Sequence, residues 1–544
     1  MDLIRTESLP GVPFEQVRKI EGKENIESMF ALYTTDESKL KGHAEWLFFP
    51  KNEEEVVTVL REMKKRGVPI TISAARTGIV GGCVPFGGAI LSLEKINAIL
   101  GLGFDEKTKQ WYIRSQPGVS LKELNEKVIQ KKFPELEEKQ KELLDKFKQD
   151  EKTYWYPVDP TEKTAHIGGT VATDASGARS YKYGPTRKWV RRIRVVLADG
   201  EILEIPRGKY HSSPEGTFTI QNTKGETKTF SIPSYRIGTN VKNAAGLFAE
   251  PSMDLIDLFI GSEGILGVIT EVEVWIIEKP ENVITVTAFF PTEMDVVSFV
   301  NDIRRKDSGL KTEFLEYLCP DSLKLLRKKQ ISDPNLVNMP TIPENAAAII
   351  FEISYTEDSL PKIYEISEVI ALKNNSSINK TWACYEDREI ERITTFRHLL
   401  PETVNAIIAE RKRENPTIHK LGTDMAVPII PETNLAEILS FYREKLMESS
   451  LEHVIFGHIG DNHVHINILP KDEKELQKAK ELYKVFAKKA VSLGGTVSAE
   501  HGIGKIKKEY FNIMFDEDKR RQIIEVKQAL DPTGLFSIGN MIDI

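Results

Sequence analysis

The stretch that decides the fold spans residues 159–185 and reads DPTEKTAHIGGTVATDASGARSYKYGP. It holds two glycine clusters, Gly168-Gly169 and Gly177, and ends in Tyr-Gly-Pro. Because glycine has no Cβ, its backbone N–H groups can approach a ligand closely, and the neighbouring Thr and Ser hydroxyl groups can donate to phosphate oxygens. Taken alone, the same pattern is as typical of a surface loop between two strands.

Two further glycine-rich stretches favour ligand binding. Residues 69–82 (PITISAARTGIVGG) run from an apolar strand pattern into a glycine turn, and residues 259–275 (FIGSEGILGVITEVEVW) run from glycines into an alternating strand. In this order and spacing, the three stretches resemble the FAD-linked oxidases of the vanillyl-alcohol-oxidase/PCMH type. Within that group, the resemblance is to the branch that contains the glycolate oxidase flavoprotein and the D-lactate and D-2-hydroxyglutarate dehydrogenases.

The resemblance implies an α+β fold in two parts. Residues 1–278 would form a PCMH-type FAD-binding domain, and residues 279–544 would form a substrate-binding and C-terminal domain. The second domain is expected to contain an antiparallel sheet with helices on one face and a C-terminal helical segment. The length of 544 residues also predicts more than one domain, because single hydrophobic cores stop growing well below this size.

The resemblance also implies which residues contact FAD. The first glycine turn would cradle the pyrophosphate, residues 159–184 would wrap the flavin, and the third stretch would pass the adenine end. Two positions depart from the family pattern, since Arg76 stands in what is usually a glycine run and Asp174 replaces an Asn. We expect non-covalent FAD, because no cysteine lies in residues 159–185 and His166 is the only nearby candidate for a covalent link. The implied contacts are Arg76, Thr77, Gly78, Gly81, Gly82, Asp159, Gly168, Gly169, Thr173, Ser176, Gly177, Tyr183, Gly184 and Ile269.

Composition and charge exclude several functions. The net charge of −7 argues against broad nucleic-acid binding. No apolar run is long enough for a transmembrane helix, and the first residues lack a secretory signal pattern. Three separated cysteines, Cys83, Cys319 and Cys384, exclude an internal Cys-x-x-Cys site and fit a reducing compartment. We therefore expect a cytoplasmic protein, either free or peripheral at a membrane.

Sequence periodicity predicts several elements. Residues 53–66 follow a helical period that ends at Gly67, and residues 131–152 are typical of an exposed, highly charged helix. Residues 206–233 indicate a surface β-hairpin with a Thr-Lys-Gly turn. In the second domain we expect a strand over 284–291, a helix over 293–306 and a strand over 346–355.

Residues 454–469 (VIFGHIGDNHVHINIL) place three histidines in an alternating apolar pattern. If Asp461-Asn462 form a two-residue hairpin turn, position 458 lies opposite position 465. His458 and His465 would then converge, with His463 on the same face, and two imidazoles so placed can bind one divalent metal. The alternative is a structural histidine pair that is hydrogen-bonded within a sheet.

The resemblance strengthens the metal interpretation. The family has Gly-His-x-Gly-Asp-Gly-Asn-x-His at this place, and its two histidines bind Zn²⁺ or a similar ion in several members. His458 and His465 match them, so a divalent metal, zinc or manganese, is implied. Asn462 and His463 replace the family's Gly-Asn, and His463 could compete for the metal or disturb the choice of ligands.

Residues 496–511 (TVSAEHGIGKIKKEYF) place a carboxylate and an imidazole side by side. By resemblance, Glu500 is the third metal ligand and His501 is the active-site base beside the flavin. Arg397, on a predicted helix, matches the family's Arg that binds the substrate carboxylate, a role that suits the planar fork of donors in arginine. An ordinary ion pair would also explain Arg397.

These features together imply an FAD-dependent dehydrogenase of a D-2-hydroxy acid of the lactate, glycolate or 2-hydroxyglutarate class. Its partners would be that acid, an electron acceptor (a quinone, an electron-transfer protein or an iron–sulfur subunit) and, in a homodimer, a second copy. The nearest alternative is an alkylglycerone-phosphate-synthase-like transferase, which shares the FAD domain but has a histidine run where this chain has Ala499-Glu500-His501. A flavin-binding electron-transfer subunit without its own substrate is another alternative.

Overall fold

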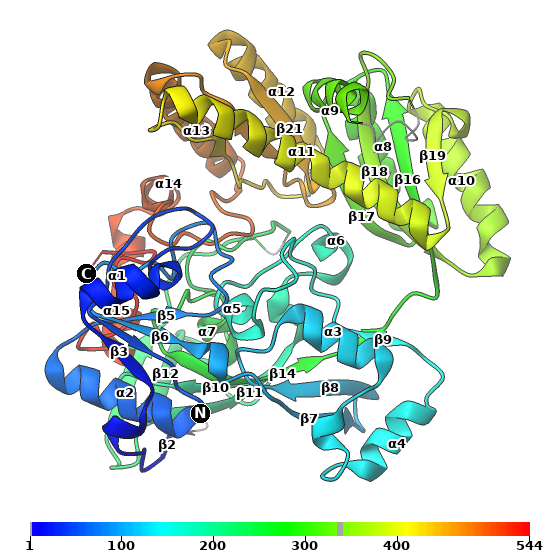
Figure 1. Ribbon diagram of the computed structural model, residues 1–544. Helices are drawn as coiled ribbons and strands as arrows, with labels where there is room; N and C mark the ends of the chain where they lie inside the picture. The colour runs from blue at the N-terminus through cyan, green and yellow to red at the C-terminus, as the bar shows by residue number, and fades with distance from the viewer. Residues whose placement is uncertain (1–2, 239, 334–340, 544) are drawn as a thin grey trace.

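The chain forms a lower unit and an upper unit in the computed structural model, which describes residues 3–238, 240–333 and 341–543 (Figure 1). The upper unit runs from β16 (Asn282–Phe290) to α13 (Glu473–Ser492), and the lower unit contains the segments before and after it. None of the helices in the described residues has the length and apolar character needed to cross a bilayer.

The first sheet of the lower unit has the strand order β3-β4-β6-β5, and its last three strands are parallel. The helix α2 (Glu53–Arg66) connects β4 to β5 and confirms the predicted helix. Its first turn is capped by the Asn52 side chain, and Gly67 ends it with a φ of 66°, a conformation that glycine adopts readily. The strands are β3 (Lys19–Glu21), β4 (Trp46–Phe48), β5 (Ile70–Ser73) and β6 (Ala89–Ser92).

The second sheet of the lower unit is antiparallel, with the order β2-β11-β10-β14-β8-β7. Its inner strand β14 (Val268–Trp275) follows the third glycine stretch and is buried except at Trp275, because it pairs with β10 and β8. The other strands are β2 (Glu7–Ser8), β7 (Ile99–Asp105), β8 (Gln110–Ser115), β10 (Val190–Val196) and β11 (Glu201–Pro206). Helices of this unit are α1 (Lys23–Met29), α3 (Leu121–Gln130), α5 (Ile167–Ala172), α6 (Ser180–Tyr183) and α7 (Leu255–Phe259).

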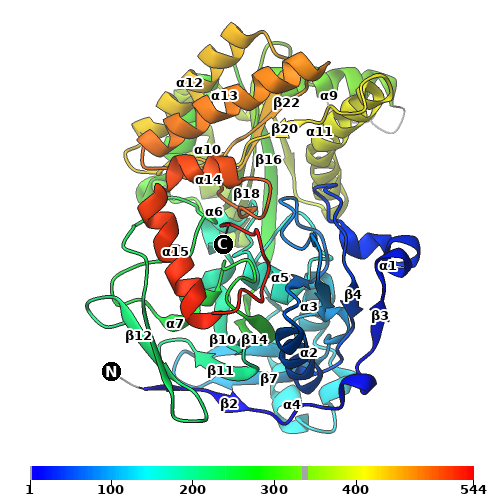
Figure 2. The same cartoon turned by 90° about the vertical axis from the view of Figure 1, so that its left-hand side faces the viewer.

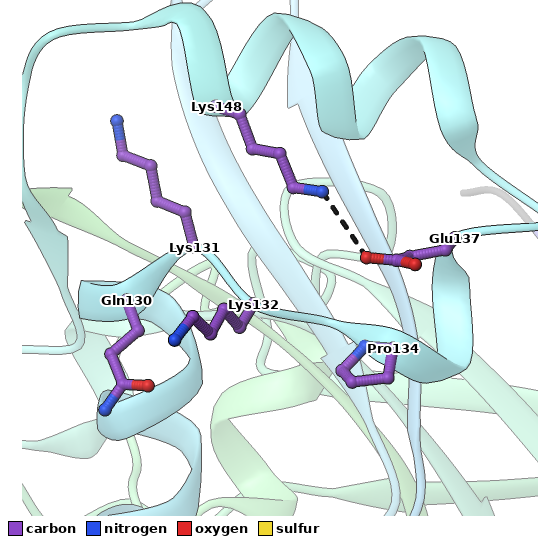
Figure 3. Close-up of a pocket in the computed structure, with 6 residues that line it drawn as sticks. All are labelled: Gln130, Lys131, Lys132, Pro134, Glu137 and Lys148. Carbon is purple, nitrogen blue, oxygen red and sulfur yellow. Dashed lines mark hydrogen bonds and ion pairs between the residues drawn. The ribbon is translucent and has the colours of Figure 1, made fainter.

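Residues 131–152 differ from the single exposed helix that we predicted. They form a 3-10 turn (Pro134–Leu136) and a short helix, α4 (Lys141–Gln149). Phe147 packs on Trp111 with their ring centroids 4.8 Å apart, so only one face of α4 is solvated. A surface depression of about 550 Å³ beside α4 is lined by Gln130, Lys131, Lys132, Pro134, Glu137 and Lys148, none of which is a predicted site residue (Figure 3).

The predicted hairpin within residues 206–233 is confirmed. Strand β12 (Thr217–Gln221) pairs with β13 (Thr227–Ser231), and the N-terminal strand β1 (Ile4–Arg5) adds to it in parallel. A separate two-stranded pairing joins β9 (Tyr154–Trp155) to β15 (Ile277–Glu278).

The upper unit is built on an antiparallel sheet with the order β19-β16-β18-β17-β21-β22-β20, which confirms the expected α+β class. The strands predicted over 284–291 and 346–355 are β16 and β18, and the helix predicted over 293–306 is α8 (Glu293–Arg304). The strands after β16 are β17 (Thr312–Leu318), β18 (Ala347–Tyr355), β19 (Thr381–Cys384), β20 (Leu421–Gly422), β21 (His453–Gly457) and β22 (His465–Ile468).

Helices cover both faces of this sheet, not one face as we expected. Phe290 packs on Phe299 of α8, with centroids 4.8 Å apart. Its neighbour Phe289 points to the opposite face, where it contacts Trp382, which in turn contacts Phe396 of α11 (Asp387–Glu414). The apolar stripe of α11 therefore buries a second face of the sheet. The remaining helices are α9 (Pro320–Ser332), α10 (Leu360–Lys373) and α12 (Thr433–Ser449).

The C-terminal segment returns to the lower unit. Helix α15 (Glu517–Leu530), drawn in red, lies alongside it in both views (Figures 1 and 2). The preceding helix α14 (Lys508–Met514) packs on α13 of the upper unit, where the rings of Tyr510 and Tyr483 stack with centroids 3.8 Å apart. After α15, Ile70 N donates to Leu535 O at 2.7 Å, and the Asn540 side chain donates to Gly82 O at 2.8 Å. The segment after α13 therefore contacts the strand and glycines of the first glycine stretch. The division of the chain at residue 278 stays a prediction.

Candidate active site

The three glycine stretches converge in the lower unit. An added Cβ at Gly169 would lie 3.1 Å from the Ala74 side chain, so the first and second stretches touch. Glu263 N donates to Ala172 O at 2.7 Å, which joins the third stretch to α5. Asn540 then links Gly82 O to Glu263 O. Segments far apart in the sequence are therefore brought to one place.

The predicted glycines serve two different purposes. A Cβ added at Gly78 or Gly82 would meet no atom nearer than 3.8 Å, so these backbones are open to a ligand. In contrast, a Cβ at Gly177 would collide with the backbone of Asp159, and one at Gly168 would collide with Pro117. Gly81 and Gly184 adopt positive φ angles of 73° and 77°. Packing and turn geometry thus account for several glycines that the family resemblance assigned to FAD.

Several predicted cofactor side chains bind to other parts of the protein. Arg76 lies over the Tyr33 ring, with its guanidinium carbon 4.3 Å from the centroid. The Tyr183 hydroxyl donates to Glu313 at 2.6 Å, and Asp159 pairs with Lys163 and Arg179. Direct contact of these side chains with FAD stays a prediction, as it does for Thr77 and the buried Ile269.

Asp174, which replaces an Asn of the family pattern, has a charged partner. It accepts hydrogen bonds from the backbone N and the side-chain Nε of Arg187, at 2.8 and 3.0 Å. The same guanidinium contacts Ile260 O, so it joins the flavin-wrapping stretch to the third glycine stretch. A carboxylate suits this arginine better than a neutral amide does.

The flavin-wrapping stretch reaches the histidine segment of the upper unit. Ser180 Oγ donates to Asp461 at 2.7 Å. Lys242 Nζ donates to Gly177 O at 3.1 Å and contacts the Glu500 carboxylate. A flavin held by residues 159–184 would therefore lie beside the histidines.

The predicted two-residue hairpin turn is wrong, although the histidines converge. Strands β21 and β22 pair with Phe456 opposite His465, and a 3-10 turn (Ile459–Asp461) follows His458. The longer turn is stabilised by Arg304 of α8, which donates to Gly460 O at 3.1 Å and to the Asn462 side chain at 2.6 Å. Three imidazoles nevertheless meet, because the centroids of His458 and His463 lie 5.4 and 4.4 Å from that of His465.

The Glu500 carboxylate completes this cluster. His458 Nε2 lies 3.2 Å from Glu500 Oε1, and ligand atoms of His458, His463, His465 and Glu500 all lie within 4.8 Å of one another. On its outer side, His458 Nδ1 contacts Glu316, and His465 Nδ1 lies 3.0 Å from Thr423 O. Oxygen partners of this kind orient metal-binding histidines in proteins.

Burial and charge oppose each other in the cluster. Burial disfavours charge on His458, but Glu316 and Glu500 outweigh it and raise the pKa of this imidazole to about 9. Burial also opposes ionisation of Glu500, yet His458 and Lys242 hold its pKa well below the usual value. At His465, burial together with the neighbouring histidines depresses the pKa, so its imidazole is neutral and able to bind a metal.

His501 lies beside the cluster and is held by Asp424. The Asp424 carboxylate accepts from His501 N at 3.0 Å, and His501 Nδ1 lies at the same distance from it. Lys507 and the Ser498 hydroxyl also donate to this buried carboxylate. The His501 ring is 30% exposed and stacks on His465 at 5.8 Å. An imidazole so oriented can exchange a proton with a small molecule.

Arg397 of α11 points to the same region. Its Nε lies 3.2 Å from Glu316 Oε2, and its side chain is 23% exposed. Burial would raise the pKa of Glu316, but Arg397 and His458 lower it to about 2. Arg397 thus makes the ion pair that was the ordinary explanation, and its role toward a substrate stays a prediction.

Comparison with known proteins gives the family. Residues 279–541 match the family described as FAD linked oxidases, C-terminal domain, and residues 44–137 and 147–206 match the FAD binding domain family. The chain belongs to the FAD-linked oxidases. Its cofactor is therefore FAD, which agrees with buried polar atoms that have no hydrogen-bond partner among the described residues, including Ser176 Oγ and His166 Nδ1.

This FAD-linked oxidase is similar along most of its length to named dehydrogenases. It is 28% identical to a D-lactate dehydrogenase of Anaerostipes hadrus, over 94% of this chain and 92% of the relative. It is 24% identical to glycolate oxidase subunit GlcD of Bacillus subtilis, over 97% and 96% of the two chains. It also resembles the solved structure of an alkyldihydroxyacetonephosphate synthase, with a TM-score of 0.58 and 15% identity over 98% and 88% of the chains. The last likeness shows the fold alone.

Three charged residues around the candidate site were missed by sequence reasoning. Lys242 and Glu316 reach the cluster, and Arg304 reaches the turn beside it, from separate segments that no local motif marks. Lys242 neutralises Glu500 and keeps two further oxygens within reach, Gly177 O and, at 3.6 Å, Asp461. Its ammonium group can therefore remain paired when Glu500 binds another cation.

Proposed function

We propose that this oxidase is an FAD-dependent dehydrogenase that converts a D-2-hydroxy acid to the 2-oxo acid. The observation that carries the proposal is His501, held by Asp424 beside the cluster of three histidines and Glu500. The names of the similar dehydrogenases support a substrate of the lactate, glycolate or 2-hydroxyglutarate class. Anaerobic reduction of the bound flavin by D- but not L-2-hydroxy acids tests the proposal.

We further propose that His458, His465 and Glu500 hold a divalent metal, zinc or manganese. The convergence of their ligand atoms and the outer oxygen partners of both histidines fit such an ion. When bound, FAD would supply the hydride acceptor, and the metal would supply a Lewis acid for the substrate hydroxyl group. Glu500 and the neutral His465 supply the charge and the lone pair that a cation needs.

His501 acts as the general base in this proposal. Its Nδ1–H points to Asp424, so Nε2 carries the lone pair that takes the hydroxyl proton. Asp424 also binds the backbone N of His501, which fixes the position of the ring. Loss of the hydroxyl proton and of the α-hydride leaves the 2-oxo acid.

Arg397 positions the substrate carboxylate, and replacing it with lysine tests this role. The arginine can keep Nε on Glu316 while its terminal nitrogens bind a carboxylate, whereas one ammonium group cannot do both. A hydrogen bond to a charged group contributes about 1.5–3 kcal/mol. Arg397→Lys should therefore raise the KM for the substrate roughly 10- to 100-fold, with FAD content intact. Steady-state kinetics measure this effect.

Arg411→Lys, on the same helix, is the matched control because Arg411 contacts Leu469 O and Glu452 away from the cluster. If Arg397→Lys kept the catalytic efficiency of the wild type, Arg397 would have only a structural role.

Two other functions are less well supported. An alkylglycerone-phosphate-synthase-like transferase would share the fold, but the Ala499-Glu500-His501 run differs from the histidine run of that group. A flavoprotein subunit that only transfers electrons would have no use for the His501 and Asp424 pair. We propose that a quinone, an electron-transfer protein or an iron–sulfur subunit reoxidises the flavin.

A further inference from the structure

His463 is a buried imidazole to which the proposed mechanism gives no role. Its side chain is 0% exposed, and neither ring nitrogen makes a hydrogen bond to the described part of the chain. A buried polar group without a hydrogen-bond partner destabilises a folded protein. Such a group often marks a place where an ion or a water binds.

The two nitrogens of this ring face different groups. His463 Nδ1 points toward the cluster and lies 3.9 Å from Glu500 Oε1. On the other side, Nε2 lies 3.0 Å from Asp424 Oδ1, at an angle unsuited to a hydrogen bond, and this oxygen also lacks a hydrogen-bond partner among the described residues. If Nε2–H is paired with Asp424, Nδ1 is the nitrogen that faces Glu500 and is free to bind an ion.

The three histidines then share one arrangement. Each has one ring nitrogen beside an outer oxygen, from Glu316, Asp424 or the Thr423 carbonyl. Each also offers a ligand atom to one cluster with Glu500, since the four atoms lie within 4.8 Å of one another. Histidines that bind metals in proteins commonly have their second nitrogen held by a carboxylate or a backbone carbonyl in this way.

We propose that His463 is a fourth protein ligand, so that the ion is held by three histidines and one carboxylate. This inference rests on the proposed metal site, and it changes the ligand set that the family resemblance implied, which has two histidines and Glu500. The sequence difference responsible is the Asn462-His463 pair, because the left-handed conformation of Asn462 (φ 52°) turns the chain so that His463 enters the cluster.

A fourth protein ligand selects the class of metal. Zinc with four protein ligands forms closed tetrahedral sites, whereas catalytic zinc retains three protein ligands and an open position. An ion that accepts five or six ligands, such as Mn²⁺, keeps open positions beside four protein ligands. Zn²⁺ should therefore bind to this site but support flavin reduction poorly, whereas Mn²⁺ should support it.

The test compares wild type, His463→Asn and the control His211→Asn, each as the full-length, FAD-loaded protein stripped of metal. His211 is exposed, lies in the lower unit and is not one of the candidate metal ligands. Titration with Mn²⁺ should show an affinity loss of at least about 10- to 100-fold in His463→Asn alone, with FAD content unchanged in all three proteins. The rates of flavin reduction with Zn²⁺ and with Mn²⁺ should also differ less in His463→Asn than in the wild type.

A measurement on the wild type does not depend on how a variant folds. X-ray absorption of the Mn²⁺-loaded protein should find three imidazole ligands. A site with two imidazoles, a wild type that binds no Mn²⁺, or wild-type Mn²⁺ affinity in His463→Asn would overturn the inference. If three imidazoles are found but no 2-hydroxy acid reduces the flavin, the ligand assignment stands and the proposed function fails.

Discussion

Replacing His501 with alanine is expected to slow flavin reduction by roughly 10²- to 10⁴-fold, the usual effect of removing a general base. Metal and FAD content should stay at wild-type levels, because His501 contacts Asp424 and stacks on His465 but is not among the proposed ligands of the metal or of FAD. Stopped-flow reduction under anaerobic conditions measures the rate, and metal analysis of the same preparation measures occupancy.

His398→Ala is the matched control for this variant, since His398 is an exposed histidine next to Arg397 and has no place in the proposed mechanism. The control should keep the wild-type rate. A His501→Ala protein that lost its metal together with its activity would assign His501 to metal binding, and an unchanged rate would exclude it as the base.

Replacing His465 with alanine should lower metal occupancy and activity together. His465 has its Nδ1 beside Thr423 O, so Nε2 faces Glu500 and His458, and removing the ring deletes a ligand from the centre of the cluster. Removing an outer partner of a metal ligand already weakens binding by about 10- to 100-fold, so loss of the ligand should cost at least that much. Metal analysis and equilibrium titration of the purified variant measure the loss.

The two phenotypes differ because a ligand fixes the ion, whereas a base acts only on the substrate proton. In the His465→Ala protein, added Mn²⁺ should restore part of the rate, and in His501→Ala it should not. If the wild type contained no divalent metal and a chelator left turnover unchanged, the histidine cluster would be structural or substrate-binding.

Local patterns predicted the elements whose causes are local. The helix over 53–66 begins at a capping Asn52 and ends at Gly67, and both signals can be seen in the sequence. The glycine stretches were also recognised, but their individual roles were not. Gly177 is required because the backbone of Asp159 packs against it, and this contact forms only when the loop has folded.

The convergence of the histidines was predicted from the sequence, but the strand register and the surrounding contacts were not. His458 and His465 converge as expected, yet their strand register differs because Arg304, from a distant helix, binds the turn between them. Lys242 and Glu316 could not be predicted, since tertiary contacts alone bring their charges to Glu500 and His458. The position of α11 over the sheet was missed for the same reason.

Anaerobic titration of the purified flavoprotein with D- and L-2-hydroxy acids tests the central claim most directly. The visible absorption of the oxidised flavin should bleach with at least one D-2-hydroxy acid and not with its L-isomer, and the 2-oxo acid should appear in equal amount. The His501→Ala protein, as control, should bleach far more slowly with the same acid but normally with dithionite. If dithionite bleached the wild-type flavin while no 2-hydroxy acid did, or if only L-isomers did, the proposed function would be contradicted.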